Sequence, residues 1–217
     1  MTFSLAARCA RTGMLGAAVT TSSIAVGSRC PFAAADVGAA LTQHMTDPRL
    51  GPLMLDRLRR GDSAQQAVDA AVAGTPGPEW RQLAVIDNQG RTASYSGANV
   101  RGERGEAHGR NCVAIANIVR SQAIPAAMVE AFEKDPDAPL ASRLTGALEA
   151  GHAAGSEPRP LVSACLIIVH REAFPYVDLR VDSDVDPIGT LRRLWHEYRP
   201  AADLYLARAV TPSASLE

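Results

Sequence analysis

Apolar residues alternate with small or polar residues in several short stretches of the chain, which is the pattern of strands with one buried face. Residues 162–169 are almost continuously apolar, as expected for a strand that is covered on both faces. A polar turn ending in Gly90 joins two apolar runs and predicts a hairpin. The predicted strands cover residues 2–9, 14–21, 37–43, 81–86, 91–96, 111–119, 162–169 and 176–181.

Helices are predicted where apolar residues recur every three or four positions. Ser63 and Gln66 fit a capping box in front of one such segment. Asp186 and Pro187 place a cap and a first-turn proline in the order typical of a helix start. Residues 99–110, rich in Gly, Arg and Glu, are predicted to form a loop. The predicted helices cover residues 52–60, 63 onward, 125–133, 140–152 and 186–198.

The predicted strands and helices come in separate blocks along the chain. Blocks of this kind favour an α+β fold, in which antiparallel sheets are layered with helices, over a doubly wound parallel sheet. No repeat, long linker or change of composition divides the sequence. We therefore expect a single domain over residues 1–209, followed by a polar C-terminal tail over residues 210–217 that is disordered.

Composition narrows the classes of partner and cofactor. The chain has 217 residues, of which 47% are hydrophobic, and a formal net charge of −1, so we expect neither a nucleic acid nor a membrane as partner. Four cysteines lie far apart without C-x-x-C spacing, which predicts reduced thiols in a cytoplasmic protein and no metal site. No glycine-rich phosphate motif opens a predicted helix, so no nucleotide cofactor is expected.

Several motifs along the chain resemble those of one known family. A strand from the second residue, a tight turn, a strand of small residues and then a basic residue form the layout of N-terminal nucleophile (Ntn) hydrolases, such as proteasome β-subunits. The fuller resemblance, up to about residue 209, is to the bacterial domain-of-unknown-function family ten twenty-eight, which is placed in that superfamily. It is carried by Met1-Thr2-Phe3-Ser4, Thr21-Ser22-Ser23-Ile24-Ala25-Val26-Gly27-Ser28-Arg29-Cys30, Thr46-Asp47-Pro48-Arg49-Leu50-Gly51-Pro52, Arg81-Gln82-Leu83-Ala84-Val85-Ile86-Asp87, Tyr95-Ser96-Gly97, Gly109-Arg110-Asn111-Cys112-Val113-Ala114, Val177-Asp178-Leu179-Arg180-Val181-Asp182 and Asp186-Pro187-Ile188.

The resemblance implies a four-layer αββα sandwich, in which two antiparallel sheets lie between helices, and family habit implies a homodimer. It also implies that Thr2 is a nucleophile whose own α-amine is the base, once Met1 has been removed. A free α-amine suits this role because its pKa of roughly 7.7–8.0 leaves a neutral fraction near pH 7. The alternative is that Thr2 is an ordinary strand start.

Other candidate site residues follow from their types and positions. Arg29 is the cation nearest the second strand, where a proteasome-type site has a lysine and an aspartate, and it favours a small substrate that bears a carboxylate. Gln43 and Asn117 are amides at strand positions where apolar residues are expected, and with Ser22 they are candidate donors to an oxyanion. His108, in the predicted loop, is a candidate substrate contact.

Three functions remain open from the sequence. The first is an amidohydrolase that cleaves a small amide or related C–N bond through Thr2. The second is a non-catalytic protein on the same fold that binds a metabolite or a partner, which the absence of the proteasome-type lysine and aspartate favours. The third, a cysteine hydrolase using Cys30 or Cys112, has no histidine placed to activate the thiol.

Overall fold

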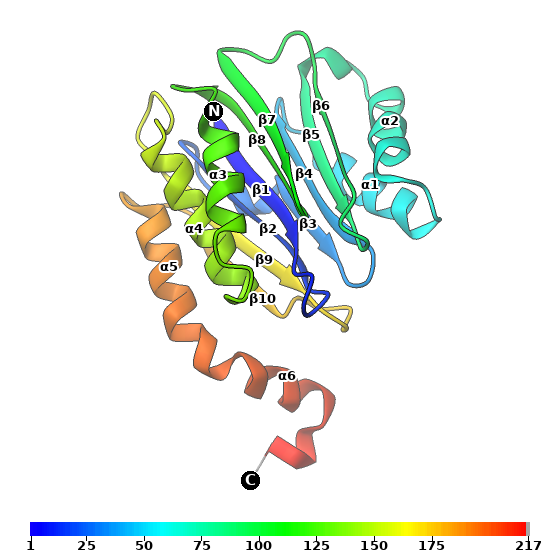
Figure 1. The fold of residues 1–217 in the computed structure, drawn as a ribbon, viewed down its shortest axis with the longest axis vertical. Coiled ribbons are helices and arrows are strands. Elements are labelled where there is room, and N and C mark those ends of the chain that lie inside the picture. The colour runs from blue at the N-terminus through cyan, green and yellow to red at the C-terminus, as the bar shows by residue number, and fades with distance from the viewer. Residues whose placement is uncertain (216–217) are drawn as a thin grey trace.

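The structure is a computed structural model that describes residues 1–215. Within these residues the strands form two antiparallel sheets, as the sequence predicts (Figure 1). One sheet has the strand order β10-β9-β2-β1-β8-β7, and the other has the order β3-β4-β5-β6. The strands are β1 (Thr2–Arg8), β2 (Leu15–Thr21), β3 (Pro31–Ala34), β4 (Gly38–His44), β5 (Arg81–Asp87), β6 (Thr92–Ser96), β7 (Glu103–Gly109), β8 (Cys112–Val119), β9 (Ser163–Val169) and β10 (Val177–Val181).

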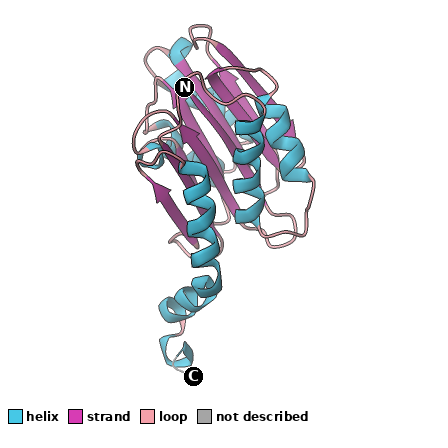
Figure 2. Ribbon diagram, turned by 90° about the vertical axis from the view of Figure 1, so that its left-hand side faces the viewer, coloured by secondary structure: helices cyan, strands magenta, loops and turns pink. Residues whose placement is uncertain are grey.

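The helices divide between the two sheets (Figure 1). Two of them contact the four-stranded sheet, and three contact the six-stranded sheet, while strands of the two sheets also contact one another. A last helix, α6, extends away from the sheets (Figures 1 and 2). In chain order the helices are α1 (Leu50–Arg59), α2 (Ala64–Gly74), α3 (Ile124–Glu133), α4 (Leu140–Ala153), α5 (Pro187–Tyr198) and α6 (Ala202–Val210).

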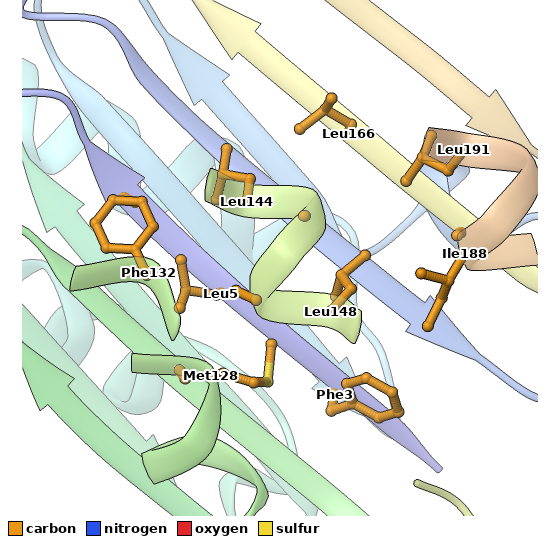
Figure 3. Close-up of a cluster of buried hydrophobic side chains, with 14 of the residues drawn as sticks. Phe3, Leu5, Met128, Phe132, Leu144, Leu148, Leu166, Ile188 and Leu191 are labelled. Carbon is orange, nitrogen blue, oxygen red and sulfur yellow. The ribbon is translucent and has the colours of Figure 1, made fainter. Parts of the chain in front are cut away.

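Strand β1 shows how alternation along a strand produces the core. Phe3 and Leu5 are fully buried in the cluster between the six-stranded sheet and its helices, where Met128 and Leu148 also lie (Figure 3). Ala6, which points to the opposite face, belongs instead to the cluster between the two sheets. Successive side chains of a strand point to opposite faces, so β1 is buried on both sides and reads as a nearly continuous run of apolar and small residues.

Helix starts follow the predicted capping. The Ser63 hydroxyl accepts a hydrogen bond from the Gln66 backbone N–H at 3.2 Å, and the Gln66 side chain accepts one from the Ser63 N–H at 2.9 Å. The Asp186 carboxylate likewise accepts from the backbone N–H of Gly189 at 3.1 Å, ahead of Pro187 in the first turn of α5. Both predicted caps are therefore confirmed.

Three elements differ from the sequence expectation. The segment predicted as a loop over residues 99–110 contains β7, an edge strand that pairs with β8. Strand β3 and helix α6 were not predicted. The predicted tail begins inside α6, which ends at Val210, and continues into a 3₁₀ turn over Pro212–Ser215, so the expected disorder does not extend over this part; the last two residues lie outside the described part of the chain.

None of the helices within residues 1–215 combines the length and the hydrophobicity that crossing a bilayer requires.

Candidate functional site

The layer between the two sheets changes from apolar to polar at one end. Ala6, Leu41, Ala84 and Ile115 belong to its apolar core. At one end of the sheets, each of these strands has a polar side chain two residues away from the apolar one. Side chains two residues apart lie on the same face, and these polar side chains are fully buried. These buried polar residues are Ser4 on β1, Gln43 on β4, Gln82 on β5 and Asn117 on β8.

Gln82 is the centre of the hydrogen bonds among these residues. Its Oε1 accepts from Gln43 Nε2 at 2.7 Å and from Asn117 Nδ2 at 3.0 Å, while its Nε2 donates to Ser96 Oγ at 3.1 Å. The Ser4 hydroxyl donates to Gln43 Oε1 at 2.8 Å. Buried polar groups are stable only when they are hydrogen-bonded, so this network fixes the orientation of both predicted amides, Gln43 and Asn117.

Asn117 has one atom without a partner. Its Oδ1 is buried and makes no hydrogen bond with the described residues, whereas its Nδ2 is held by Gln82. Thr2 is the residue paired with Asn117 across β1 and β8. A carbonyl-type oxygen is an acceptor, so Asn117 is better suited to hold an N–H or ammonium group beside Thr2 than to donate to an oxyanion.

Thr2 lies at the start of β1 with only 6% of its surface exposed. Its hydroxyl contacts the Met1 carbonyl oxygen and lies 3.4 Å from the hydroxyl oxygen of Thr21, at the end of β2. The Thr21 hydroxyl in turn donates to the Met1 carbonyl at 2.5 Å. Two hydroxyl groups therefore surround one carbonyl at the entrance to the polar layer.

Glu157 brings a buried carboxylate to the same end of the sheets. It comes from the segment between α4 and β9, is 2% exposed, and accepts from the backbone N–H of Ser22 at 2.9 Å through Oε2. Its Oε1 is buried and has no partner among the described residues. Burial raises the pKa of the Glu157 carboxyl to about 7, opposed by the Ser22 hydrogen bond and the Met1 α-amine. Burial lowers the pKa of the Met1 amine, and the charge of Glu157 acts in the opposite direction.

His44, at the end of β4, has a defined protonation pattern. Its Nδ1 lies 2.8 Å from the Trp80 carbonyl oxygen, and its Nε2 accepts from the Arg101 backbone N–H at 3.2 Å. A carbonyl only accepts and a backbone N–H only donates, so the ring carries its single proton on Nδ1. Burial lowers the pKa of His44, and the Met1 amine, Arg101 and Arg104 lower it further. The imidazole is therefore neutral and lies near the chain's first amine.

The backbone is distorted at two places along this end. His44 has φ of 72°, and Ile118, directly after Asn117, has φ of 50°, a region that β-branched residues rarely adopt. Pairing of β7 with β8 is interrupted here, because Glu103 faces Val119 and the next residue faces Asn117. Such bulges redirect side chains next to functional sites, and here the bulge ends the regular pairing directly beside Asn117.

Ser22 and Arg29 occupy the loop that follows β2. Ser22 contacts the site twice, through its backbone N–H to Glu157 and through its hydroxyl, which lies 3.6 Å from the Met1 sulfur. The Arg29 guanidinium donates to the carbonyls of Ile24 and Ala25, both at 2.8 Å, and to the Ser23 hydroxyl at 2.6 Å. These hydrogen bonds join Arg29 to residues of its own loop and stabilise that loop. A role of Arg29 in binding substrate stays a prediction.

His108 lies in strand β7 rather than in a loop. Its Nδ1 is 2.7 Å from the Thr92 hydroxyl and its Nε2 is 2.8 Å from the Ser94 hydroxyl, both on β6. It therefore connects the edge strands of the two sheets. Opposite it on β8 is Val113, four residues before Asn117, or roughly 13 Å along a strand. Its ring nitrogens and its position point to a structural bridge away from Thr2.

The cysteines are free and buried. Burial raises the pKa of the Cys30 thiol to about 11 and that of the Cys112 thiol to about 12. A protonated thiol is a poor nucleophile, so this electrostatic setting disfavours the cysteine-hydrolase alternative. Across the part of the chain that the structure describes, no group of three or more His, Cys, Asp or Glu side chains is arranged to hold a metal ion.

Sequence patterns bring out Thr2, Ser22, Gln43 and Asn117, which the fold places at one end of the sheets. Glu157 was missed because its segment, from Gly155 to Pro160, has the composition of any exposed turn. Thr21 and Gln82 carry a weak signal, since each is a polar residue on the same alternating face as apolar neighbours. His44 gives no signal in the sequence, because no metal- or catalysis-type partner lies near it along the chain.

Comparison with solved structures gives a strong similarity to a protein of known structure. The crystal structure of protein SPO2555 from Silicibacter pomeroyi, a DUF1028 protein, matches with a TM-score of 0.84 and 30% sequence identity, over 91% of this chain and 88% of that one. Anbu (ancestral beta-subunit) from Yersinia bercovieri matches with a TM-score of 0.39 and 12% identity, over 90% and 93% of the two chains, which is too low to support a conclusion. No curated protein matches.

Residues 2–191 match the model of a family of unknown function, DUF1028. The match begins at Thr2 and includes the strands that carry the polar layer, together with Glu157. The chain therefore belongs to the DUF1028 family.

Proposed function

We propose that this chain is an Ntn-type amidohydrolase, in which Thr2 cleaves the C–N bond of a small amide after Met1 has been removed. The observation that carries the proposal is the position of the Thr2 hydroxyl, buried at the end of the polar layer beside a second hydroxyl and one carbonyl. Removal of one residue converts the Thr2 nitrogen from an amide into a free amine next to that hydroxyl. Threonine is small enough for ordinary removal of a preceding methionine.

The reaction begins with attack of the Thr2 hydroxyl oxygen on the amide carbonyl carbon, and the α-amine takes the hydroxyl proton. The proton then passes to the leaving nitrogen, the C–N bond breaks, and an ester to Thr2 remains. Water, deprotonated by the same amine, hydrolyses the ester and releases the acid. The position supports this role, because burial lowers the pKa of the Met1 amine one residue away, and burial disfavours the charged form of any amine at this end of β1.

Two buried acceptors support the idea that the amine is held when it becomes protonated. Asn117 Oδ1 is buried without a partner opposite Thr2, and Glu157 has one oxygen free. A charged ammonium group is expensive to bury unless it is hydrogen-bonded, so these oxygens favour its formation during attack. They take the place of the carboxylate that the sequence lacks near the second strand.

The hydroxyl of Thr21 is the best-placed donor to a developing oxyanion. It already donates to the carbonyl oxygen next to Thr2, that of Met1, at 2.5 Å. Gln43 and Asn117, the donors expected from the sequence, have their amide nitrogens bonded to Gln82. Gln43 therefore acts in this proposal by fixing Ser4 and Gln82, and Ser22 by holding Glu157 through its backbone N–H.

The fold also supports the proposal. Helices α1 and α2 contact the four-stranded sheet, α3, α4 and α5 contact the six-stranded sheet, and the sheets contact each other. This order is the one required of a four-layer αββα sandwich with its site at the end of the central layer. The same proposal includes a small substrate that bears a carboxylate. It also includes assembly of the chain as a homodimer.

The test combines mass and activity. Intact mass of the purified chain reports whether Met1 is absent, and turnover is then measured on a panel of small amides and ureido compounds. We expect Thr2→Ala to reduce kcat by at least about 1000-fold and Thr2→Ser to retain part of the activity. Thr20→Ala is the matched control, because Thr20 bonds the Ser163 carbonyl at 2.9 Å on the neighbouring strand.

The opposite results are equally informative. Full turnover by Thr2→Ala would remove Thr2 from the mechanism. A retained Met1, with its carbonyl held by Thr21, favours the second function, a metabolite-binding protein on the same fold.

A further inference from the structure

A cleft of about 320 Å³ lies at the same end of the four-stranded sheet. Its lining consists of Met45, Pro76, Gly77, Trp80, Arg81 and Arg101. His44 and Arg81, which pair across β4 and β5, are each one residue beyond the paired Gln43 and Gln82 of the buried network. Successive side chains point to opposite faces, so Arg81 lies on the other side of the sheet from Gln82. His44 connects the cleft with the end of the chain that begins at Thr2, because its Nε2 accepts from the Arg101 N–H and the Met1 amine helps to lower its pKa.

Arg81 is fixed in the wall of this cleft and forms no ion pair with the described residues; Asp47, whose pKa the Arg81 charge helps to lower, is paired with Arg49. Its Nη1 donates to the Met45 carbonyl and its Nη2 to the Pro76 carbonyl, the latter at 3.0 Å. Its Nε is buried and has no partner among the described residues. The guanidinium charge is therefore held in place by neutral carbonyls, and no ion pair within residues 1–215 neutralises it.

Arg101 is the second cation of the cleft. Its guanidinium lies over the Trp80 ring, 5.4 Å from the centroid, and makes no hydrogen bond or ion pair with the described residues. Its backbone N–H is anchored on His44, whose ring stacks parallel to Trp80 at 6.3 Å. An arginine placed over an aromatic ring keeps its in-plane donors available for an anion.

The surroundings of the cleft are cationic. The charges that shift the pKa of His44 are the Met1 amine, Arg101 and Arg104, all of which lower it. Glu79, on the turn before Trp80, is a carboxylate in this segment and forms no ion pair with either cleft arginine among the described residues. An anion entering here meets two guanidinium groups.

The cleft also has an apolar side. Met45 is 45% exposed and faces it together with Pro76 and Trp80. A ligand that contacts these side chains and both arginines is an organic molecule with an apolar body and one anionic group. Guanidinium groups match the planar geometry of a carboxylate through paired N–H donors.

We infer that this cleft binds the carboxylate of a small organic acid with an apolar body, and that it holds the substrate of Thr2 by that carboxylate. That this ligand is a substrate rests on the proposed function. That the cleft binds such an acid does not depend on the proposed function. The assignment gives Arg81 and Arg101 the carboxylate-binding role that the sequence favoured for Arg29.

Binding is measured through Trp80 fluorescence with phenylacetate and phenylacetamide, which differ in charge and hardly in shape. The chain has two tryptophans, so Trp195→Phe leaves Trp80 as the reporter. We expect phenylacetate to bind at least 10-fold more tightly than phenylacetamide, and Arg101→Gln to remove that preference. Arg60→Gln, an exposed arginine after α1, is the matched control for net charge.

Calorimetry on the unsubstituted chain repeats the measurement in case Trp195→Phe, a core substitution, unfolds the protein. The inference would be overturned if the two ligands bound with equal affinity, or if Arg60→Gln lost the preference for phenylacetate as fully as Arg101→Gln. Binding of inorganic phosphate as tight as that of phenylacetate would also overturn it. Titration and turnover together separate the two proposals. Phenylacetate binding by the unsubstituted chain without turnover of any amide would refute only the hydrolase, whereas turnover by that chain that is indifferent to a carboxylate on the substrate would refute only the cleft. Thr2→Ala is expected to keep phenylacetate binding and to lose turnover.

Discussion

Glu157 differs at the residue scale from the buried carboxylates of Asp47 and Asp87, which are paired with arginines. Glu157 is 2% exposed, with one oxygen on a backbone N–H and the other without a partner. Its nearest opposite charge, the Met1 amine, lies beyond ion-pair distance, since no ion pair joins them among the described residues. Folding therefore favours the neutral carboxylic acid over the carboxylate.

This setting predicts a pH-dependent stability that Glu157→Gln removes. The pKa is about 7 in the folded chain, above the ordinary value near 4.3 of the unfolded chain. Between these pH values the folded chain binds more protons than the unfolded chain. The stabilisation that Glu157 contributes is therefore complete below about pH 4 and is lost as the pH rises through 7. From pH 4.5 to 8 we expect the free energy of unfolding to fall relative to Glu157→Gln by up to about 3 kcal/mol.

Urea unfolding of both chains at several pH values measures the difference. Glutamine keeps an oxygen for the Ser22 N–H and cannot ionise, so it isolates the charge. Parallel pH profiles for the two chains would contradict the raised pKa.

Residue types alone locate only part of the site. Gln43 and Asn117 stand out because polar groups on buried strand faces are unusual, whereas Thr2 stands out only through the resemblance to a known family; the structure has all three at one end of the sheets. Glu157 belongs to the same end for a different reason, the path of the distant loop between α4 and β9. Such proximity depends on tertiary packing, for which no local pattern exists.

At the scale of one element, helix α4 contains two glycines that differ in their surroundings. A Cβ at Gly146 would meet nothing within 4 Å, whereas one at Gly151 would lie 3.0 Å from both Met128 and Phe3. We expect Gly146→Ala to stabilise the chain by about 0.5–1 kcal/mol, through helix propensity. Gly151→Ala is expected to destabilise it by about 1–3 kcal/mol, because both neighbours are fully buried.

Denaturant unfolding of the two variants side by side checks this contrast, and each serves as the control of the other. If both variants changed the free energy of unfolding by the same sign and size, packing of α4 on β1 would not restrict the side chain at position 151.

Elements with a clear hydrophobic period were predictable, and those without one were not. The helix α5 shows a cap, a proline and a spaced apolar face, all visible in sequence. Strand β7 reads Glu-Arg-Gly-Glu-Ala-His-Gly, which has no apolar face because an edge strand pairs on one side only. Its pairing with β8 comes from backbone hydrogen bonds, which leave no trace in residue type.

At the scale of the whole molecule, α6 contributes little to the packed body. It extends from the sheets, and Ala202 is its one buried residue among those described (Figure 2). We expect deletion of residues 203–217 to shift Tm by less than about 4 °C. Deletion from Pro187 onward is the control and should prevent folding, because it also removes the buried Ile188, Leu191 and Trp195. A large loss of Tm in the shorter deletion would mean that α6 supports the core.

The strand order has a consequence for synthesis on the ribosome. Strand β1 is made first but lies in the interior of its sheet, between β2 and β8. Translation adds about 5–20 residues per second, so β8, which begins at Cys112, emerges about 5–20 seconds after β1. Until then one edge of the nascent hairpin, carrying Phe3 and Leu5, has no neighbour. The growing polypeptide is thus exposed to aggregation for most of its elongation, and holdase chaperones would have their longest opportunity at its beginning.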